Sequence, residues 1–445
     1  MLLRYIVGNF KSIGHPVEFS MLPTEKSEDD RFLKTIKTKF GDWKVLCRGG
    51  FFGPNASGKT SFIESVEFAR DYIINGQKSG KGTGISIFKG DIEEFGGSSV
   101  FQFMFYLQGE VYEYGFSLDR QKVNEEWLMQ LTKKDFVPLF TRATDEKEKT
   151  SIEITSEFAR NKSKDRELSE VLKNSIQENQ KNQLFLYKLY ENGVKKAEKI
   201  VEWFKRIQVI FPETKIQALP IRMNADEELR TYIGTMLHKM DTGVYEISVT
   251  KDEIDFHEFA EKLDLPKEMI EEIEEIKNGI VSFAGKYFIF AEKKKKTVLV
   301  QLKFTHRLNH KPVQFNIDEE SDGTQRLLDL LPMLFTIGKA SSIYFIDEID
   351  RSLHTKLSQF LLDEFIDTNA DGFNQIIFTA HDVNLINLHS FCQEEIWLVE
   401  KNASGESQLK PLSNFEIKEG QNALKAYLSG RFGAVPLLRR DNSCR

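Results

Sequence analysis

Apolar and polar residues alternate with a period of two over much of the first 140 residues. The segments "LLRYIVGNF" and "HPVEFSML" are each typical of a β-strand. The segment "SSVFQFMFYLQGEVYEYGFSLD" alternates on both sides of "QGE", which predicts a β-hairpin. Two more strands are expected at "EEWLMQLT" and "FVPLFTRA". Between these segments, the apolar "KVLCRGGFFG" ends in glycine and leads into a helix predicted from Lys59 to about Tyr72.

From residue 321 onward, short apolar strands alternate with helical patterns. Helices are predicted over 324–337 and 354–367, and strands at "SSIYFIDEI", "NQIIFTAH" and "EIWLVEK". Such alternation favours a largely parallel sheet covered by helices. We therefore predict that 1–140 and 301–445 form the two parts of one α/β domain, which has a mixed or parallel sheet and an additional antiparallel β lobe.

The middle of the chain has a different texture. Charged residues dominate 156–209, with leucines and aromatics at helical spacing, and a second acidic helical stretch covers 252–278. The segment "KYFIFAEKKKKTVLVQLKF" alternates around a lysine run and predicts another hairpin. The expectation for 141–300 is thus a mainly helical insertion that ends in a β-hairpin.

Composition narrows the class of protein. The chain has 445 residues, a formal net charge of -7 and 40% hydrophobic residues, which is ordinary for a globular protein with one large or two medium cores. The acidic balance argues against a surface coated in basic charge for nonspecific nucleic-acid binding, although one local basic stripe would be compatible with it. The lysine run at 293–296 could contact nucleic acid or an acidic trigger, or could be a solvated hairpin tip.

The cysteines and the hydropathy pattern favour a reducing, cytoplasmic setting. Cys47, Cys392 and Cys444 form no CxxC pair, so neither a disulfide framework nor a zinc ribbon is expected. The start has no long apolar core or small-residue cleavage site of a signal peptide. No run reaches about 18 consecutive apolar residues, so we expect no membrane contact.

The segment "GPNASGKTS", from Gly53 to Ser61, matches the phosphate-binding pattern G-x-x-x-x-G-K-[ST]. It follows an apolar strand and opens a helix, a context that outweighs the alternative of a glycine-rich turn with a chance lysine. The glycines permit a tight turn whose N–H groups surround a phosphate, and the helix N-terminus adds positive potential. Lys59 would reach the β- and γ-phosphates of ATP, and the Thr60 hydroxyl would ligate Mg²⁺. The predicted nucleotide-binding residues are Gly53, Asn55, Ala56, Ser57, Gly58, Lys59, Thr60 and Ser61.

Two later strands end in residues that suit the other half of an ATPase site. In "SSIYFIDEID" a buried strand would bring Asp347 to the carboxyl edge of the sheet, where it would hold Mg²⁺, and Glu348 would deprotonate the attacking water. In "QIIFTAHD" the strand would end at His381, which can hydrogen-bond the γ-phosphate or that water. The alternatives are a solvated acidic turn for the carboxylates and a capping histidine at 381.

The order of these motifs resembles that of ABC-type ATPases, and most closely the SMC/OLD-like branch. In that family a signature loop precedes the Asp-Glu pair by about one helix, and "SDGTQR" aligns with it: Gly323 and Gln325 fall on the pattern, while Ser321, Asp322 and Thr324 depart from it. "IVGNFKSIGHPVEF" and "YLSGRFGAVP" resemble the N-terminal hairpin and the C-terminal tail of the branch. The resemblance covers about 1–125 and 300–436.

The resemblance implies an ATP site that is completed by a second copy of the chain. Ser321, Gly323 and Gln325 would contact a γ-phosphate bound by a neighbour, and Asp350 would turn toward that neighbour. ATP would then be sandwiched in a homo-oligomer. The alternatives are an ordinary helix cap at Ser321 and another at Asp350, before "RSLHTKL". For the glutamine that links the metal site to the insertion in this family, the candidates are Gln102 and Gln108.

Three features indicate which members of the class the chain resembles. The insertion lacks sustained heptads for an SMC-type coiled coil. Little follows the switch histidine, so no TOPRIM nuclease is expected within the chain, and nothing suggests transport. The chain thus resembles stand-alone ATPases encoded beside an effector in bacterial two-gene anti-phage systems, such as the ATPase subunit of PARIS, and abortive-infection ATPases. This implies a sensor and scaffold that responds to a phage protein and controls a separately encoded nuclease. The alternative is a DNA-repair or DNA-end-processing ATPase that acts on nucleic acid directly.

Overall fold

The protein forms two compact units in the computed structural model. Unit 1 comprises Met1–Pro212, Ile337–Asp350 and Ser358–Arg445, and unit 2 comprises Glu213–Thr336 and Arg351–Leu357. The structure describes the following residues: 1–24, 32–78, 80–90, 97–145, 147–155, 158, 163–216, 218–262, 266–274, 278–283, 286–291, 296–417 and 422–436.

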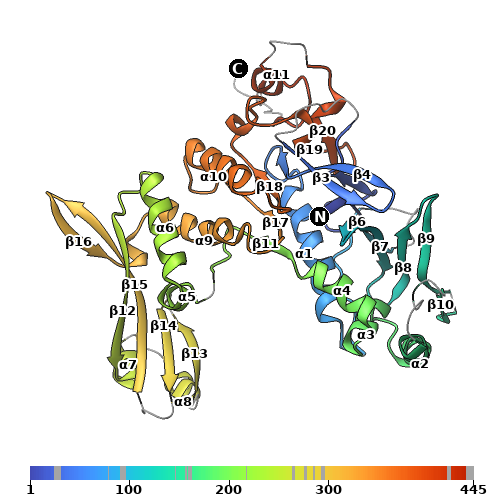
Figure 1. The fold of residues 1–445 in the computed structure, drawn as a ribbon, viewed down its shortest axis with the longest axis horizontal. Helices are drawn as coiled ribbons and strands as arrows, with labels where there is room; N and C mark the ends of the chain where they lie inside the picture. The colour runs from blue at the N-terminus through green and yellow to red at the C-terminus, as the bar shows by residue number, and fades with distance from the viewer. Residues whose placement is uncertain are drawn as a thin grey trace, which may run out of the picture. The chain divides into compact units, whose positions relative to one another are not determined.

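An antiparallel sheet makes up one layer of unit 1 (Figure 1). Its strand order is β10-β9-β8-β7-β6-β1-β2. The predicted hairpin is confirmed as β6 paired with β7, and its two turn residues, Gln108 and Gly109, have φ angles of 52° and 86°. Two positive φ angles are typical of the tight turns that match the strand twist. The strands are β1 (Leu2–Gly8), β2 (Val17–Ser20), β6 (Ser99–Leu107), β7 (Glu110–Leu118), β8 (Val123–Leu131), β9 (Phe136–Thr144) and β10 (Thr150–Ile154).

A second, mostly parallel sheet carries the predicted site motifs. Its order is β11-β17-β18-β5-β19-β20, with parallel pairs throughout except that β20 runs antiparallel to β19. Every residue of β5, β17 and β18 is buried, as expected for strands covered on both faces. The predicted fold class, a parallel sheet with an antiparallel β lobe, is confirmed. The strands are β5 (Arg48–Phe52), β11 (Ile207–Ile210), β17 (Ile343–Ile346), β18 (Gln375–Ala380), β19 (Ile396–Lys401) and β20 (Ser407–Pro411).

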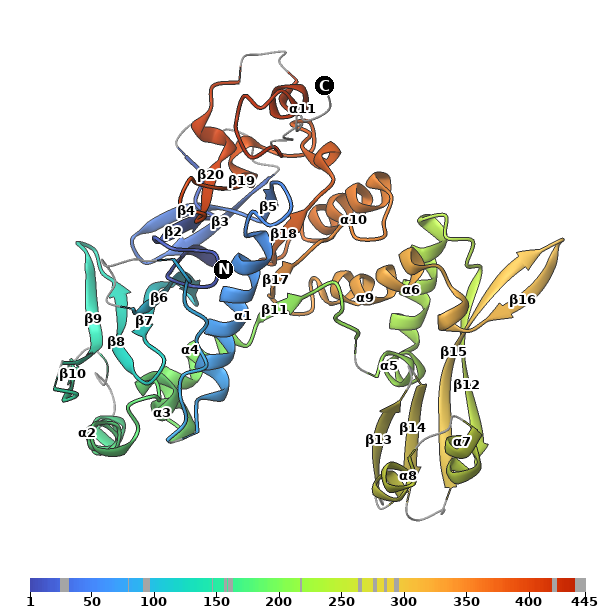
Figure 2. The same cartoon turned by 180° about the vertical axis from the view of Figure 1, so that it is seen from behind.

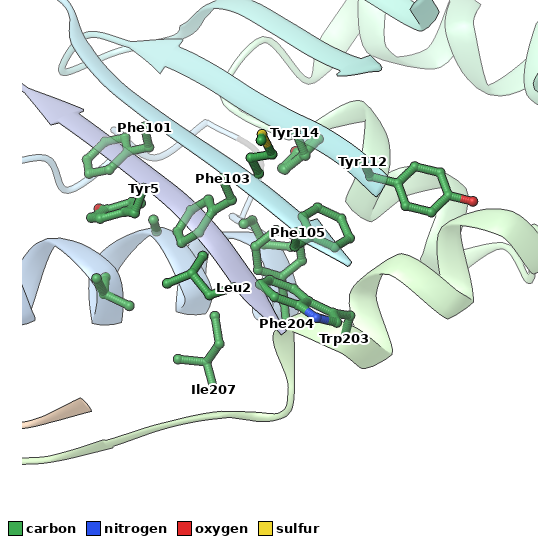
Figure 3. Packing of buried hydrophobic residues seen from close by; sticks show 14 of the residues in the cluster. Leu2, Tyr5, Phe101, Phe103, Phe105, Tyr112, Tyr114, Trp203, Phe204 and Ile207 are labelled. Carbon is green, nitrogen blue, oxygen red and sulfur yellow. The ribbon is translucent and has the colours of Figure 1, made fainter. Parts of the chain in front are cut away.

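The helix α1 (Lys59–Asn75) packs between the two sheets. The ring of Phe62 lies 4.7 Å from that of Phe51 on β5 and 5.5 Å from that of Tyr5 on β1. Further along the same core, Phe105 stacks on Trp203 of α4 (Lys195–Phe204), with ring centroids 4.2 Å apart (Figure 3). Buried aromatic rings of this size supply much of the hydrophobic stabilisation of a core. The start of α1 is therefore held firmly relative to the parallel sheet.

The remaining elements of unit 1 border these layers (Figure 2). A short hairpin, β3 paired with β4, was not predicted from the sequence. Among the described residues, no helix is long and apolar enough to span a bilayer. These elements are β3 (Leu33–Thr38), β4 (Gly41–Leu46), α2 (Ser163–Asn179), α3 (Phe185–Glu191), α10 (Thr355–Thr368, whose first turn belongs to unit 2) and α11 (Ala423–Leu428).

Unit 2 combines a five-stranded antiparallel sheet with helices. The order is β12-β15-β14-β13, and β16 also pairs with β15. The β14–β15 pair confirms the predicted hairpin, whereas lysines 293–295 lie outside the described residues. The strands are β12 (Glu246–Ile254), β13 (Asn278–Phe283), β14 (Lys286–Ala291), β15 (Lys296–Leu308) and β16 (Lys311–Phe315); the helices are α5 (Leu219–Ala225), α6 (Glu227–Lys239), α7 (Phe256–Lys262), α8 (Lys267–Glu274) and α9 (Asp322–Thr336).

The middle of the chain differs from the mainly helical insertion expected over 141–300. Residues 141–212 belong to unit 1, and unit 2 continues to Thr336. The helical prediction was wrong at 207–209, which lie in β11, and at 252–254, which end β12. Both are edge strands of their sheets, and in the second the charged residues Lys251, Asp252 and Glu253 are all exposed. Their pairing with distant strands, which local periodicity does not register, decides their structure.

Candidate nucleotide-binding site

The loop between β5 and α1 has the backbone of a phosphate-binding loop. Ala56 and Gly58 adopt positive φ angles of 61° and 111°. A Cβ atom on Gly53 would lie 2.1 Å from the carbonyl oxygen of Val399, and one on Gly58 would lie 1.9 Å from Oγ of Ser407. Both glycines are therefore required for two reasons. The β19–β20 hairpin packs directly against the loop, and the loop itself turns tightly.

Lys59 is buried at the start of α1 and points back over the loop. The residue is 5% exposed, and Nζ donates hydrogen bonds to the carbonyl oxygens of Gly53 (2.7 Å) and Pro54 (3.1 Å). Burial lowers the pKa of Lys59, while the nearby carboxylates of Asp347, Asp350 and Glu348 act in the opposite direction. The loop thus holds a cation beside the N–H groups of the first turn of α1, which favours an anion there.

A chain of hydrogen bonds joins α1, β17 and β18 at the centre of the site. The Thr60 hydroxyl donates to Oδ2 of Asp347 (2.9 Å), and the Thr379 hydroxyl donates to Oδ1 (2.6 Å). Asp347 is 2% exposed; burial raises its pKa, and the two hydroxyl hydrogen bonds oppose this shift. Hydroxyl and carboxylate oxygens from two distant segments therefore meet, which is the donor set that Mg²⁺ prefers.

Glu348 and His381 lie together at the more exposed side of the site. Oε1 of Glu348 is 3.2 Å from Nε2 of His381, and the two side chains are 31% and 39% exposed. Glu348 has a φ angle of 47°, which is uncommon for a residue with a Cβ, and its N–H donates to Oγ1 of Thr379 (2.8 Å). The left-handed backbone turns the Glu348 carboxylate away from Asp347 and toward the histidine. Strained residues of this kind are frequent at functional sites.

These groups surround one cleft of about 600 Å³. All of the predicted loop residues except Gly53 line it, as do Glu348 and His381, whereas Asp347 lies beneath. The hydroxyl oxygen of Ser57 is buried at the cleft and has no hydrogen-bond partner among the described residues, which fits a group that binds a ligand oxygen. The lining residues are Ser12, Asn55, Ala56, Ser57, Gly58, Lys59, Thr60, Ser61, Glu348, His381 and Lys401.

The carboxylate of Asp350 is used within its own chain. Oδ2 accepts hydrogen bonds from the backbone N–H groups of His381 (2.9 Å) and Asp382 (2.6 Å). It therefore fastens the turn after β17 to the loop that carries the histidine. The helix that follows, α10, begins only at Thr355, so in this structure Asp350 is not the residue that caps it.

The predicted signature loop belongs to unit 2, whereas the residues that line the cleft belong to unit 1. Ser321 Oγ accepts a hydrogen bond from the N–H of Thr324 (3.1 Å) and lies 2.9 Å from its hydroxyl, so it caps α9. The side chain of Gln325 donates to the carbonyl oxygen of Glu320. A Cβ atom on Gly323 would lie 2.8 Å from the carbonyl oxygen of Ser352. The helix-cap alternative thus describes Ser321 in the isolated chain.

Several residues of the site were not found from the sequence. Thr379 bonds both Asp347 and Glu348, and its only signal is a polar residue inside a buried strand. Ser12, Lys401 and Ser407 come from the N-terminal loop and the β19–β20 hairpin, which no motif connects to the phosphate loop. Conversely, Gln102 lies within β6 and Gln108 in its turn, and neither lines the cleft.

The fold and the cleft define a P-loop nucleotide-binding domain. A family model described as "AAA domain, putative AbiEii toxin, Type IV TA system" matches residues 50–387. The chain belongs to this family of P-loop ATPase domains. No curated protein matches the chain significantly.

Similar solved structures include three SMC head domains. The SMC head domain from Thermotoga maritima is 12% identical, with 94% of this chain and 99% of that chain covered and a TM-score of 0.39. An SMC head bound to the C-terminal winged-helix domain of ScpA is 12% identical, with 93% and 99% covered and a TM-score of 0.43. An SMC head with an extended coiled coil, bound to the C-terminal domain of ScpA derived from Pyrococcus furiosus, is 13% identical, with 97% and 99% covered and a TM-score of 0.39.

Proposed function

We propose that the protein binds ATP with Mg²⁺ in the cleft and hydrolyses it to ADP and phosphate. The observation that carries the proposal is the hydrogen-bonded chain Thr60–Asp347–Thr379. It lies beneath a buried lysine and a serine hydroxyl that has no partner among the described residues. Membership of a P-loop ATPase family supports the same conclusion. The N–H groups of the loop and of the first turn of α1 would bind the β-phosphate, and Lys59 would exchange its carbonyl partners for phosphate oxygens.

Thr60 and Asp347 are the residues that would hold Mg²⁺. The described residues include no group of three or more His, Cys, Asp or Glu arranged to hold a metal, so phosphate and water oxygens would complete the coordination. When bound, Mg²⁺ neutralises charge on the β- and γ-phosphates. Burial raises the pKa of Asp347 because the charged carboxylate is desolvated. A bound cation would stabilise this charged form.

Glu348 and His381 would act on the γ-phosphate. Glu348 would accept a proton from a water molecule while the water oxygen attacks the γ-phosphorus. The bond between that phosphorus and the ADP oxygen would then break. His381 would donate a hydrogen bond to the γ-phosphate oxygens. Asp350 would keep the histidine loop in place through its two backbone hydrogen bonds.

A second part of the proposal is self-association around ATP. The loop with Ser321, Gly323 and Gln325 opens α9, a helix of 15 residues, and Ser321 and Asp322 are exposed. The free N–H groups of a first helical turn favour an anion, whichever chain carries it. We therefore assign this loop to the γ-phosphate of a neighbouring copy.

A third part concerns biological role: an ATP-driven sensor and scaffold that responds to a phage protein and controls a separately encoded TOPRIM-type nuclease in anti-phage defence. The description of the family, which names a putative AbiEii toxin and a type IV TA system, supports the part of this role that concerns a toxin system. Direct action on DNA is the competing function. The net charge of -7 does not favour it.

The hydrolysis and the composite site can be tested together with two complementary variants. Lys59→Ala disables a chain's own cleft, and Asp322→Trp puts bulk on its exposed signature loop. Each variant alone should have little Mg²⁺-dependent turnover, and mixing should restore part of it because one intact composite site can form. Asp371→Trp, which changes an exposed aspartate of unit 1, is the control and should behave like wild type. No turnover by wild type would contradict the ATPase, and no recovery at any mixing ratio would contradict the composite site.

The role in defence is tested by affinity purification of the tagged chain together with its genomic neighbour. Co-purification of a nuclease, and toxicity only when both proteins are expressed, would support the sensor and scaffold. Turnover that is strongly stimulated by DNA, with a steep loss as salt increases, would instead support direct action on nucleic acid.

A further inference from the structure

Lys401 lines the same cleft as Glu348 and His381, but it belongs to a strand on the other side of β5. The sheet order places β17 and β18 on one side of β5 and places β19 on the other. Glu348 follows β17 and His381 follows β18, whereas Lys401 is the last residue of β19. The phosphate loop, which follows β5, therefore lies between the predicted catalytic residues and Lys401.

This order fixes the direction of a nucleotide in the proposed function, on which the inference rests. The loop N–H groups surround the β-phosphate, and the γ-phosphate must face Glu348 and His381 for hydrolysis. The α-phosphate and the ribose are attached on the opposite side of the β-phosphate. They consequently extend toward β19, where Lys401 lines the cleft.

The strand that carries Lys401 is held directly against the phosphate loop. Lys401 pairs in register with Ser407, whose hydroxyl donates to the carbonyl oxygen of Ser57 (2.7 Å). The N–H of Ser407 also donates to the carbonyl oxygen of Ser12 (2.8 Å), which brings the N-terminal loop to the same wall. The backbone position of Lys401 relative to the β-phosphate site is thus set by hydrogen bonds on both sides.

The ammonium group of Lys401 forms no ion pair with any described carboxylate. Within the described part of the chain, Lys59 and Lys401 are the lysines that line the cleft. A neighbouring lysine of the same hairpin, Lys410, contrasts with it, because its Nζ is 2.6 Å from Oε1 of Glu400. An exposed ammonium on a cleft wall stabilises a phosphate by a charge-assisted hydrogen bond.

We propose that Lys401 binds the α-phosphate–ribose end of the nucleotide. It is a binding residue for the nucleoside end, distinct from Lys59 at the β- and γ-phosphates. Its contact is made equally in the bound substrate and in the transition state, so it lowers KM and leaves kcat unchanged. ADP retains the same end, so Lys401 binds the product as strongly as the substrate.

The test measures binding of ATP and of ADP by calorimetry, and steady-state turnover, for full-length Lys401→Met. We expect both dissociation constants to rise by a common factor of about ten, the size of one charge-assisted hydrogen bond, with kcat unchanged. Lys401→Arg should restore binding because it keeps the charge. Lys410→Met is the control, because it removes a lysine of the same hairpin that does not line the cleft.

Each other outcome overturns the inference in a recognisable way. Unchanged binding of both nucleotides would show that Lys401 makes no contact. A loss confined to ATP, or a fall in kcat, would place Lys401 at the γ-phosphate instead. If wild type itself bound no nucleotide, the proposed function would fail first, which separates the two failures.

Discussion

The candidate nucleotide cleft of unit 1 and the predicted signature loop of unit 2 differ in how their polar groups are hydrogen-bonded. At the cleft, the Ser57 hydroxyl is buried with no hydrogen-bond partner among the described residues, Lys59 is a buried cation, and Asp347 is buried beneath the cleft. In the loop, Ser321 and Thr324 hydrogen-bond each other. A buried polar group without a partner costs free energy, so a ligand that hydrogen-bonds this group would be bound more favourably.

The difference indicates that the cleft can bind a ligand within one chain, whereas the proposed role of the loop requires a second copy. The cleft is already assembled within one unit by hydrogen bonds between α1, β17 and β18. In the loop, the side chains of Ser321, Thr324 and Gln325 are hydrogen-bonded within the chain, and Ser321 and Asp322 are exposed at the start of α9.

The largest effect is expected at the catalytic end of the cleft. Glu348→Gln should lower kcat by about 10²- to 10⁴-fold, because the amide cannot accept the proton of the attacking water. ATP binding should persist and keep the assembled state populated. Turnover and size-exclusion chromatography in ATP are the measurements, with Glu364→Gln on α10 as the control. Wild-type turnover in Glu348→Gln would remove this residue from the catalytic role.

A smaller effect is expected from the buried network beneath it. Thr379→Val keeps the shape of the side chain but removes the hydrogen bonds to Asp347 and Glu348. The free energy of unfolding should fall by about 1–3 kcal/mol, because a buried carboxylate loses a donor. Chemical denaturation measures this. Thr368→Val, at an exposed threonine of α10, should be close to neutral, and equal stability of the two variants would show that the network is not needed in the free protein.

The pH range over which kcat/KM is high should be narrower than the range expected from the usual pKa values of aspartate and lysine. The raised pKa of Asp347 means that its carboxylate is lost, as pH falls, above the usual aspartate value of about 3.9. The lowered pKa of Lys59 means that its ammonium is lost, as pH rises, below the usual lysine value of about 10.4. The value of kcat/KM should decrease about tenfold per pH unit below the pKa of Asp347 and above the pKa of Lys59. In Lys59→Arg the alkaline limb should disappear from this range, and a limb that stayed in place would belong to another group.

The smallest effect is expected in the signature loop. Ser321→Ala removes the cap of α9 and should cost about 1 kcal/mol of stability, measured by thermal unfolding. ATP binding to the isolated chain should be unchanged, because the residue does not line the cleft. Ser321→Asp, which can still cap, should recover the stability. A loss of ATP affinity in a monomeric chain would erase the distinction between cleft and loop.

Local sequence was sufficient wherever a motif and its strand or helix are contiguous. The phosphate loop, the Asp347–Glu348 pair and His381 each follow a short apolar strand, and each pattern placed its residues at the same cleft rim or beneath it. The prediction was weaker for charged edge strands such as β12, because their conformation depends on pairing partners far along the chain. The role of Asp350 was also out of reach, since its hydrogen bonds go to a loop 31 residues away.

The sequence by itself determined that this is a P-loop domain with a parallel sheet, because backbone freedom at Gly53 and Gly58 and apolar runs of strand length are local properties. Only the tertiary structure decided that Thr379 joins the two acidic residues and that Lys401 and Ser12 face the same cleft. Hydrogen bonds and packing between strands distant in the chain bring these residues together, and no spacing within the sequence encodes those distances.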